Sequence, residues 1–326
     1  MAKYKVLIAT YPFAKTGKKP LELLVSTGWE LKFNPYGRRL KVGEIGEIIE
    51  DVDAIIAGTE PYPTEILKRS KVKAINRVGI GLDNVPLQVC KDLGIQVTYT
   101  PDAPSQGVAE LTVANIINLA RHVLPSDRSV REGAWNRLMG MLINDMTIGI
   151  VGIGRIGKTV IELIQPFRPN LLVCDIDPNL EFGRKYDLNW CEKEVLFEKS
   201  DIVSLHIPGS TRNHKYLDRV TISKMKTGAA IINTSRGVVV DEKALYDALI
   251  QKHLSGAALD VFVQEPYEGP FSQLDNVVMT AHIAASAKGS RYLMELGAVE
   301  DCIRVLQGKE PKTTALTPEN IKQQKG

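Results

Sequence analysis

Three polar side chains in the second half of the sequence could together handle a carboxylate and a proton. Arg236, Glu265 and His282 each follow shortly after an apolar run. A guanidinium can hold a substrate carboxylate through paired hydrogen bonds. A carboxylate beside an imidazole favours the charged ring and fixes its tautomer. Such a ring can give a proton to a carbonyl group while a hydride arrives from a nicotinamide, so the set predicts reduction of a carbonyl.

The apolar runs before these residues predict where the side chains lie. Ala230–Asn233, Ala257–Leu259 and Val277–Met279 are typical of buried strands. In open α/β sheets, ligands bind outside the carboxyl ends of the strands, which is where the three side chains would stand. Interpretations without a catalytic role stay open at this point. An Arg after a strand often forms a surface ion pair, and a Glu-Pro step is often part of a loop. His282 would then be a structural histidine.

A glycine-rich stretch, Thr147–Asp175, predicts the cofactor. Its parts are a strand at Ile148–Val151, the pattern Gly152-x-Gly154-x-x-Gly157, a helix at Ile156–Ile164, a second strand at Leu171–Cys174, and Asp175. The glycines allow a tight turn and a close approach of a pyrophosphate, which the helix N-terminus attracts. An acid about 20 residues further on accepts hydrogen bonds from the ribose and repels a 2′-phosphate. A bare GxGxxG is often only a turn, but this context predicts NAD, bound by Gly152, Gly154, Arg155, Ile156, Gly157 and Asp175.

Elements elsewhere in the sequence alternate between strands and helices, which predicts parallel sheets. The first hundred residues contain strands at Tyr4–Ala9, Trp29–Phe33, Ala54–Ala57, Ala74–Val78 and Gln96–Tyr99, with helices at Leu21–Ser26, Val42–Glu50, Pro63–Ser70 and Val85–Leu93. A longer apolar helix at Ala109–Val123 could link two domains. A strand at Ile202–Ile207 and a final helix at Arg291–Leu306 complete the pattern, and Gly308–Gly326 is expected to be a loose tail.

The composition limits the classes of protein to which the chain could belong. The chain has 326 residues, 41 basic against 38 acidic, and a net charge of +3. No basic run interleaves with aromatic residues, which argues against a nucleic-acid surface. The four cysteines lack metal-binding spacing and are expected to be reduced thiols. No cleavable signal or apolar stretch of about 20 residues is present, so we expect a soluble cytoplasmic protein without membrane contact and without a bound metal.

Several motifs together resemble one enzyme family. They are the glycine fingerprint, RVGIGLDNV (Arg77–Val85), VAELT (Val108–Thr112), NTSRG (Asn233–Gly237), DVFVQEP (Asp260–Pro266) and HIA (His282–Ala284). On these residues the chain resembles the D-isomer-specific 2-hydroxyacid dehydrogenases over nearly its whole length. Ala281 departs from the pattern, because the family commonly has Pro before the histidine; the change affects no catalytic atom.

The resemblance implies an α/β fold of two doubly wound parallel-sheet domains with a cleft between them. Residues 1–102 plus 286–326 would form a flavodoxin-like substrate domain, and residues 103–285 a Rossmann NAD domain. Arg236 would hold the substrate, His282 would be the acid/base and Glu265 its partner. Backbone amides of Val78 and Gly79 would bind the carboxylate. Further residues implied to line the cofactor are Val108, Thr112, Ile207, Pro208, Thr234 and Asp260. A homodimer with the Trp135 segment crossing to the partner is also implied.

The substrate prediction rests on arginines. The segments that contain Arg77 and Arg137 look most like phosphoglycerate dehydrogenases, where the matching positions lie near a substrate phosphate, and Arg38 and Arg39 could add charge. The favoured substrate is therefore 3-phosphoglycerate or a related phosphorylated or phosphonylated acid. These arginines could instead be solvated or form ion pairs, and an inward-pointing Glu60 would repel a phosphate.

Alternative functions share the fold. The first is a glyoxylate/hydroxypyruvate reductase, which needs no phosphate-binding arginines. A phosphite dehydrogenase has the same catalytic residues. From a different class, an NAD(H)-sensing corepressor usually carries extended disordered tails, which the sequence does not suggest.

Overall fold

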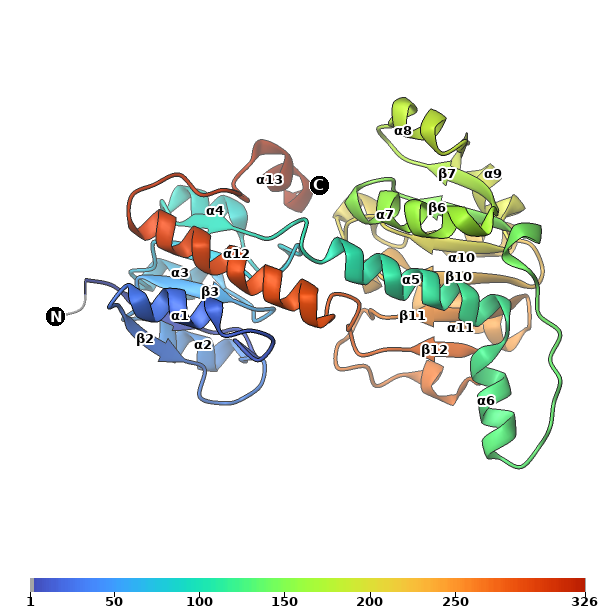
Figure 1. The fold of residues 1–326 in the computed structure, drawn as a ribbon, viewed down its shortest axis with the longest axis horizontal. Helices are drawn as coiled ribbons and strands as arrows, with labels where there is room; N and C mark the ends of the chain where they lie inside the picture. Colours follow the sequence, from blue (N-terminus) through green and yellow to red (C-terminus); the bar gives the residue numbers. More distant parts are fainter. Residues whose placement is uncertain (1–2, 326) are drawn as a thin grey trace. The chain divides into compact units, whose positions relative to one another are not determined.

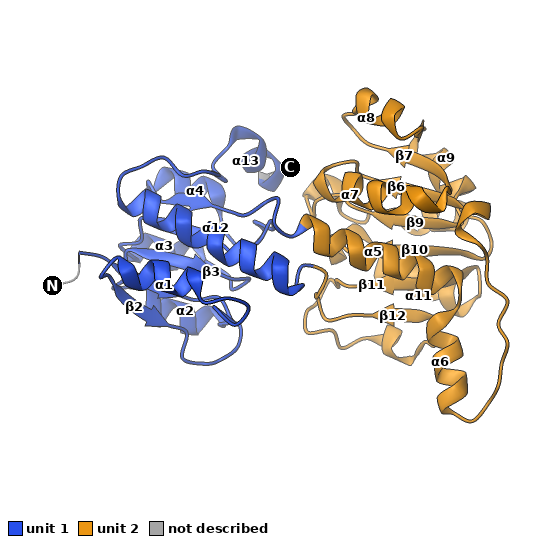
Figure 2. Ribbon diagram, viewed as in Figure 1, with its two compact units in different colours: residues 1–104, 285–326 blue, residues 105–284 orange. Residues whose placement is uncertain are grey.

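The chain forms two compact units in the computed structural model, which describes residues 3–325. Unit 1 comprises residues 1–104 and 285–326, and unit 2 comprises residues 105–284 (Figure 2). The predicted domain boundaries fall near the ends of these units, and the functions assigned to the two domains stay predictions.

Unit 1 is built on a five-stranded parallel sheet with the order β2-β1-β3-β4-β5 (Figure 1). Its strands are β1 (Lys5–Ile8), β2 (Glu30–Phe33), β3 (Ala54–Ala57), β4 (Ala74–Arg77) and β5 (Gln96–Thr98). Its helices are α1 (Lys19–Ser26), α2 (Val42–Ile49), α3 (Thr64–Arg69), α4 (Leu87–Asp92), α12 (Lys288–Leu306) and α13 (Pro318–Lys325).

Strands β1 and β3 of unit 1 are nearly continuous apolar runs, because both faces of the sheet are buried there. Val6, Ile8 and Ile56 face one side, where Met294 and Val299 of α12 pack against them. Leu7, Ile55 and Ile75 face the other side with apolar residues of α2, α3 and α4. Helix α12 therefore completes the core of a sheet that ends nearly two hundred residues earlier in the chain.

The predicted loose tail is wrong for the residues that are described. Ala315 is fully buried and its N–H donates to the carbonyl of Val97 at 2.8 Å. Ile321 of α13 is also buried in the core of unit 1. The Asp301 carboxylate accepts the N–H groups of Lys312 and Thr313, which turns the chain back onto the sheet. Residue 326 lies outside the described residues.

Unit 2 contains a seven-stranded parallel sheet with the order β12-β11-β10-β9-β6-β7-β8. Its strands are β6 (Thr147–Val151), β7 (Asn170–Cys174), β8 (Asn189–Trp190), β9 (Ile202–Leu205), β10 (Ala229–Asn233), β11 (Leu254–Leu259) and β12 (Val277–Met279). Its helices are α5 (Ser105–Ala120), α6 (Val123–Arg131), α7 (Arg155–Ile164), α8 (Leu180–Lys185), α9 (Lys193–Lys199), α10 (Arg219–Lys224) and α11 (Glu242–Ile250). Short 3-10 helices are η1 (Ile143–Asp145), η2 (Gln165–Phe167), η3 (Thr211–Asn213), η4 (Gly237–Val239) and η5 (Pro270–Gln273).

The order of strands in unit 2 reverses direction between β6 and β9. The chain proceeds from β6 to β7 and β8 on one side, then returns to β9 and continues to β12 on the other. In open α/β folds, the carboxyl ends of the strands at this reversal are where dinucleotides bind. The glycine turn after β6 stands at that position.

Three sequence-based interpretations of unit 2 are corrected. Helix α5 belongs to unit 2 and lies beside α7 rather than linking two domains (Figure 1). It ends at Ala120, and His122 in the left-handed region (φ +51°) separates it from α6. The sequence analysis also missed β8 and the helices α6 and α8 to α11. Among residues 3–325, no helix is long and apolar enough to cross a membrane.

Candidate active site

Arg236, Glu265 and His282 lie at the carboxyl edge of the sheet in unit 2. They follow β10, β11 and β12, which are neighbours in the sheet. The Oε2 atom of Glu265 lies 2.9 Å from Nδ1 of His282. The structure thus joins the carboxylate and the imidazole that the sequence placed 17 residues apart. Because Nδ1 faces Glu265, Nε2 is the ring nitrogen left to meet a substrate.

The electrostatics of Glu265 favour its charged form. Burial raises the pKa of this carboxyl, whereas the hydrogen bond and the charge of His282 lower it. The N–H of Phe262, 3.1 Å from Oε1, and the charge of Arg236 act in the same direction. The net result is a pKa of Glu265 below the ordinary value, so the carboxylate is available to orient the ring.

A tight turn fixes the backbone of Arg236. The Asn233 side chain donates to the Arg236 carbonyl at 2.9 Å and accepts from the N–H and hydroxyl of Ser235. The next residue must be glycine, because a Cβ on Gly237 would lie 2.0 Å from the carbonyl carbon of Phe262. The sequence analysis missed Asn233, although an Asn that ends a strand just before a functional residue is a known signal for such a turn.

The glycine turn has the shape that a dinucleotide needs. A Cβ on Gly157 would lie 2.0 Å from the Gly152 carbonyl oxygen, so helix α7 packs on the turn only because glycine is there. Gly154 has open space around it, and no side chain caps the N-terminus of α7. The helix N–H groups and its positive dipole end therefore remain available for a pyrophosphate.

Two backbone hydrogen bonds fix the carboxylate of Asp175. Its Oδ2 atom accepts the N–H of Ile153 at 2.5 Å, and Oδ1 accepts the N–H of Asp177 at 2.9 Å. The carboxylate is partly exposed. A fixed acid at the end of the second strand suits the two ribose hydroxyls of NAD and disfavours a 2′-phosphate.

The other predicted cofactor residues fall into two groups. Arg155 and Pro208 are exposed, and Ile156 and Ile207 are half-buried, which is compatible with contact to a ligand.

Thr112 and Asp260 are 0% exposed, and Val108 and Thr234 are also buried. The hydroxyl of Thr112 lies 3.0 Å from that of Thr234 and donates to the Val108 carbonyl. Thr112 therefore joins α5 to the residue that follows β10, and its contact with the cofactor stays a prediction.

In unit 1, the predicted donors Val78 and Gly79 already have acceptors. The Val78 N–H donates to the Ala57 carbonyl at 2.8 Å, and the Gly79 N–H donates to the Thr100 hydroxyl at 2.9 Å. A substrate carboxylate would have to replace these bonds. The role of the two amides stays a prediction.

The arginines behind the phosphate prediction differ in their surroundings. Arg77 is 6% exposed and donates to the Val78 carbonyl and the Asn84 side chain. Arg38 forms a bidentate pair with Glu44. Arg39 and Arg137 are exposed. Two of the four are therefore engaged within unit 1.

The carboxylate of Glu60 is buried within unit 1. It is 1% exposed, and its Oε1 accepts from the Gly58 N–H at 2.7 Å and from the Tyr62 hydroxyl at 2.5 Å. The repulsion of a phosphate by Glu60 requires its carboxylate to face the substrate. In the structure, the carboxylate instead bonds to Gly58 and Tyr62 within unit 1.

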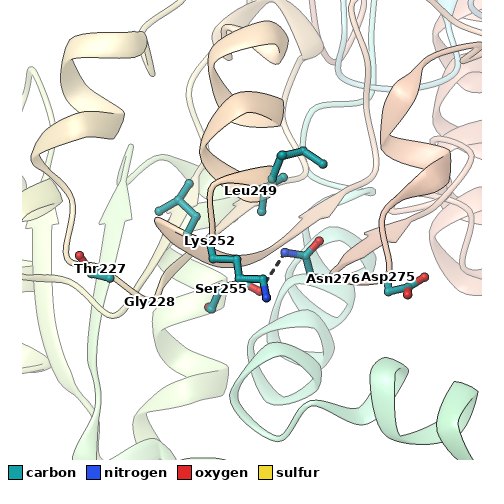
Figure 3. A pocket seen from close by; sticks show the side chains of 9 residues that line it. Thr227, Gly228, Leu249, Lys252, Ser255, Asp275 and Asn276 are labelled. Carbon is teal, nitrogen blue, oxygen red and sulfur yellow. Dashed lines mark hydrogen bonds between the residues drawn. The ribbon is translucent and has the colours of Figure 1, made fainter.

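A cavity of about 480 Å³ lies at the opposite edge of the sheet in unit 2 (Figure 3). Lys252, Ser255 and Asn276 line it, at the amino ends of β11 and β12. This edge is remote from the carboxyl ends that carry the catalytic candidates, so the cavity is not the reaction site. Within residues 3–325, no group of three or more His, Cys, Asp or Glu side chains could hold a metal ion.

Comparison with known proteins identifies the family. Residues 113–284 match the model of the NAD binding domain of D-isomer specific 2-hydroxyacid dehydrogenases. A glyoxylate reductase of Korarchaeum cryptofilum is 34% identical over 275 residues, which are 81% of this chain and 83% of that protein. A D-3-phosphoglycerate dehydrogenase of Methanocaldococcus jannaschii is 33% identical, over 86% of this chain but 55% of that protein.

A solved structure gives the same result. The crystal structure of a glyoxylate reductase from Paecilomyes thermophila superimposes with a TM-score of 0.86 at 25% identity, over 98% of this chain and 99% of that one. The chain therefore belongs to the D-isomer specific 2-hydroxyacid dehydrogenases, which confirms the resemblance and the fold class. It is an oxidoreductase of that class, and its cofactor is NAD.

Proposed function

We propose that this enzyme interconverts a small, unphosphorylated D-2-hydroxy acid and its 2-keto acid, with glyoxylate and hydroxypyruvate as the keto substrates. The observation that carries the chemistry is the contact between Glu265 and His282 at the sheet edge where Arg236 also stands. A cation for the carboxylate and a paired imidazole for the proton are the groups this reaction requires.

In the proposed mechanism, Arg236 holds the carboxylate and polarises the carbonyl of the keto acid. Bound NADH supplies the hydride. His282 donates the proton from Nε2 to the carbonyl oxygen, and Glu265 at Nδ1 keeps the ring in the required tautomer. In the reverse direction the same ring accepts the hydroxyl proton.

The choice of an unphosphorylated acid rests on Arg77 and Arg38. A guanidinium that is 6% exposed and donates inward is poorly placed to bind a dianion. The bidentate pair with Glu44 likewise neutralises Arg38. This preference differs from the sequence-based one. The phosphorylated acid remains the second candidate because Arg39 and Arg137 are exposed.

A homodimer is part of the proposal. The segment after α6 exposes large apolar side chains, with Trp135 75% and Met139 92% accessible. Exposed patches of this kind often mark protein–protein contacts. Light scattering of the purified protein should give twice the mass of the 36.0 kDa chain, and Trp135→Ser should shift the population toward monomer.

The substrate is tested by following NADH oxidation with glyoxylate, hydroxypyruvate and 3-phosphohydroxypyruvate in parallel. A higher kcat/KM with the two small acids supports the proposal. A strong preference for 3-phosphohydroxypyruvate would replace it with the second candidate. Turnover of none of the three would contradict both.

A further inference from the structure

Glu242 is a half-buried carboxylate that the proposed mechanism does not use. It is the first residue of α11 and follows Arg236 closely in the chain. Burial raises the pKa of its carboxyl above the ordinary value, although a hydrogen bond from the Val263 N–H acts in the opposite direction. Partial removal of a carboxylate from water is unfavourable, so a role other than solvation of the surface is expected for it.

The side chain of Glu242 bonds to the loop that carries Glu265. Its Oε1 atom accepts the N–H of Val263 at 2.7 Å. The preceding N–H group, that of Phe262, donates to Oε1 of Glu265 at 3.1 Å. The other oxygen of Glu265 lies 2.9 Å from Nδ1 of His282. Two successive N–H groups of one loop therefore meet two different carboxylates, one from α11 and one that orients the imidazole.

Backbone packing confines the same peptide group of the loop. A Cβ on Gly237 would lie 2.0 Å from the carbonyl carbon of Phe262 and 2.4 Å from the nitrogen of Val263. The ring of Phe262 also stacks on that of Tyr267, with the ring centroids 4.2 Å apart and an angle of 28° between the planes. The bond to Glu242 thus adds a directed, charge-assisted interaction to a peptide group that already packs closely.

The stretch of chain that presents Glu242 is itself anchored. The N–H of Asp241 donates to the Leu217 carbonyl at 2.9 Å. The side chain of Asp241 forms an ion pair with Lys215 at 3.1 Å. A side chain on such a support can fix a neighbouring loop. Because the stretch begins at Arg236, it connects the guanidinium that holds the substrate with the loop that carries Glu265.

We propose that Glu242 is a positioning residue for Glu265 and, through it, for His282. Its carboxylate fixes the Val263 N–H, so the loop after β11 holds Glu265 against Nδ1 of the imidazole. Without that acceptor, the Val263 N–H competes for the carboxylate of Glu265 on its own loop and draws it away from the ring. The inference rests on the proposed function, because it requires the role of His282 as the acid/base.

The test compares Glu242→Ala and Glu242→Gln with the wild-type enzyme, using whichever of the three keto acids the wild type reduces fastest. Glu242→Ala removes the acceptor. Because a misplacement of about 1 Å can lower turnover roughly 10²-fold, we expect kcat to fall by roughly 10- to 10²-fold. Glu242→Gln keeps a carbonyl oxygen that accepts the N–H and should bring kcat to within about threefold of wild type.

The binding constants separate positioning from binding. The proposal gives Glu242 no contact with substrate or cofactor. The KM of the keto acid and the dissociation constant of NADH, measured by fluorescence, should therefore stay within about twofold of wild type in both variants.

A signature independent of turnover is the imidazole signal of His282 in NMR spectra. Glu242→Ala should shift it, and Glu242→Gln should return it toward the wild-type position. Glu268→Ala is the matched control, because Glu268 is an exposed acid shortly after Glu265, and it should change neither kcat nor the signal. Thermal melting identifies a variant that fails to fold. Glu242→Met, which fills the volume without an acceptor oxygen, then takes the place of Glu242→Ala.

Each possible result bears on a particular statement. Wild-type kcat and an unchanged His282 signal in Glu242→Ala would overturn the inference. A weaker affinity for NADH that accounts for the loss of activity would make Glu242 a binding residue and would also overturn it. A loss of kcat that Glu242→Gln fails to recover would do the same, because the charge and not the bond to Val263 would be the cause. Absence of turnover by the wild-type enzyme would instead contradict the proposed function, while the NMR comparison would still decide whether Glu242 positions the ring.

Discussion

The carboxylate of Asp175 accepts a hydrogen bond of 2.5 Å from the backbone N–H of Ile153, so the acid after β7 is tied to the glycine turn after β6. The glycine turn and Asp175 are separate in sequence, and this bond fixes one relative to the other. A carboxylate held in this way cannot easily rotate away from a 2′-phosphate, so the repulsion between the two would remain.

The wild-type enzyme should therefore prefer NAD over NADP by a large factor in kcat/KM. Asp175→Ala should weaken that preference, because it removes both the repulsion of the 2′-phosphate and the bonds to the ribose. A hydrogen bond to a charged group contributes about 1.5–3 kcal/mol, so kcat/KM with NAD should fall by roughly one to two orders of magnitude. Equal efficiency of the wild type with both cofactors would contradict our interpretation of Asp175.

Replacement of His282 by Ala should lower kcat roughly 10²–10⁴-fold, the usual contribution of a general acid/base. The binding of NADH should be unaffected, which steady-state kinetics and fluorescence titration together measure. A loss of less than about tenfold would mean that another group transfers the proton.

Stability should decline in acid as Glu265 becomes protonated. The pKa of this carboxyl is lowered by the hydrogen bond and charge of His282 despite partial burial. The stabilisation from the pair is therefore present above the ordinary carboxyl pKa and is lost as pH falls through the lowered one. The pair of Glu265 and His282 causes part of the loss of stability in acid, and this part should disappear in Glu265→Gln. Melting temperatures of the two proteins between pH 7 and pH 3 measure the difference.

His206 predicts a second dependence of stability on pH. Burial lowers the pKa of this ring to about 4, and its Nε2 lies 2.9 Å from the Ser204 hydroxyl. Because the unfolded ring binds a proton more readily, stability should fall as pH drops from about 6.5 toward 4. His206→Asn should flatten this part of the melting curve against pH. An unchanged dependence would show that other groups cause it.

The C-terminal helix should stabilise unit 1 through Gln324. Its amide donates to the carbonyls of Leu82 and Val85 and accepts the N–H of Leu87. With a net gain of about 0.5–1.5 kcal/mol for a typical hydrogen bond, Gln324→Ala should lower the free energy of unfolding by about 1–2 kcal/mol. Gln323→Ala, at an exposed neighbouring position, is the control. Equal unfolding midpoints in urea for the two variants would contradict this role.

Much of the fold and of the candidate site was open to prediction because the signals are local. The strand, glycine turn and helix around Gly152–Gly157 occur within one short stretch, and apolar runs mark most strands. Strand β8 was missed because it consists only of Asn189 and Trp190, too short for any period. The docked tail was missed because Gln324 bonds to residues more than 230 positions earlier.

The surroundings of the candidate residues were harder to predict than their identities. The sequence motifs predicted that Glu265 is the partner of His282. Nothing local in the sequence indicates that Asp260 bonds to a loop 20 or more residues later. Arg77 likewise has the type of a phosphate ligand, and only its burial beneath the Val78 carbonyl shows that the guanidinium is engaged. Residue type limits what a side chain can do, and long-range packing decides what it does.

The position of α12 in the chain has a consequence for synthesis. The sheet of unit 1 is complete at Thr98, yet the helix that covers one of its faces begins at Lys288. During translation, the apolar side chains of Val6, Ile8 and Ile56 lack the packing of Met294 and Val299 until the whole of unit 2 has left the ribosome, although Leu24 of α1 packs in the same cluster. Unit 2 is therefore the first part of the chain able to fold autonomously, and the nascent N-terminal segment is the part that needs protection from aggregation.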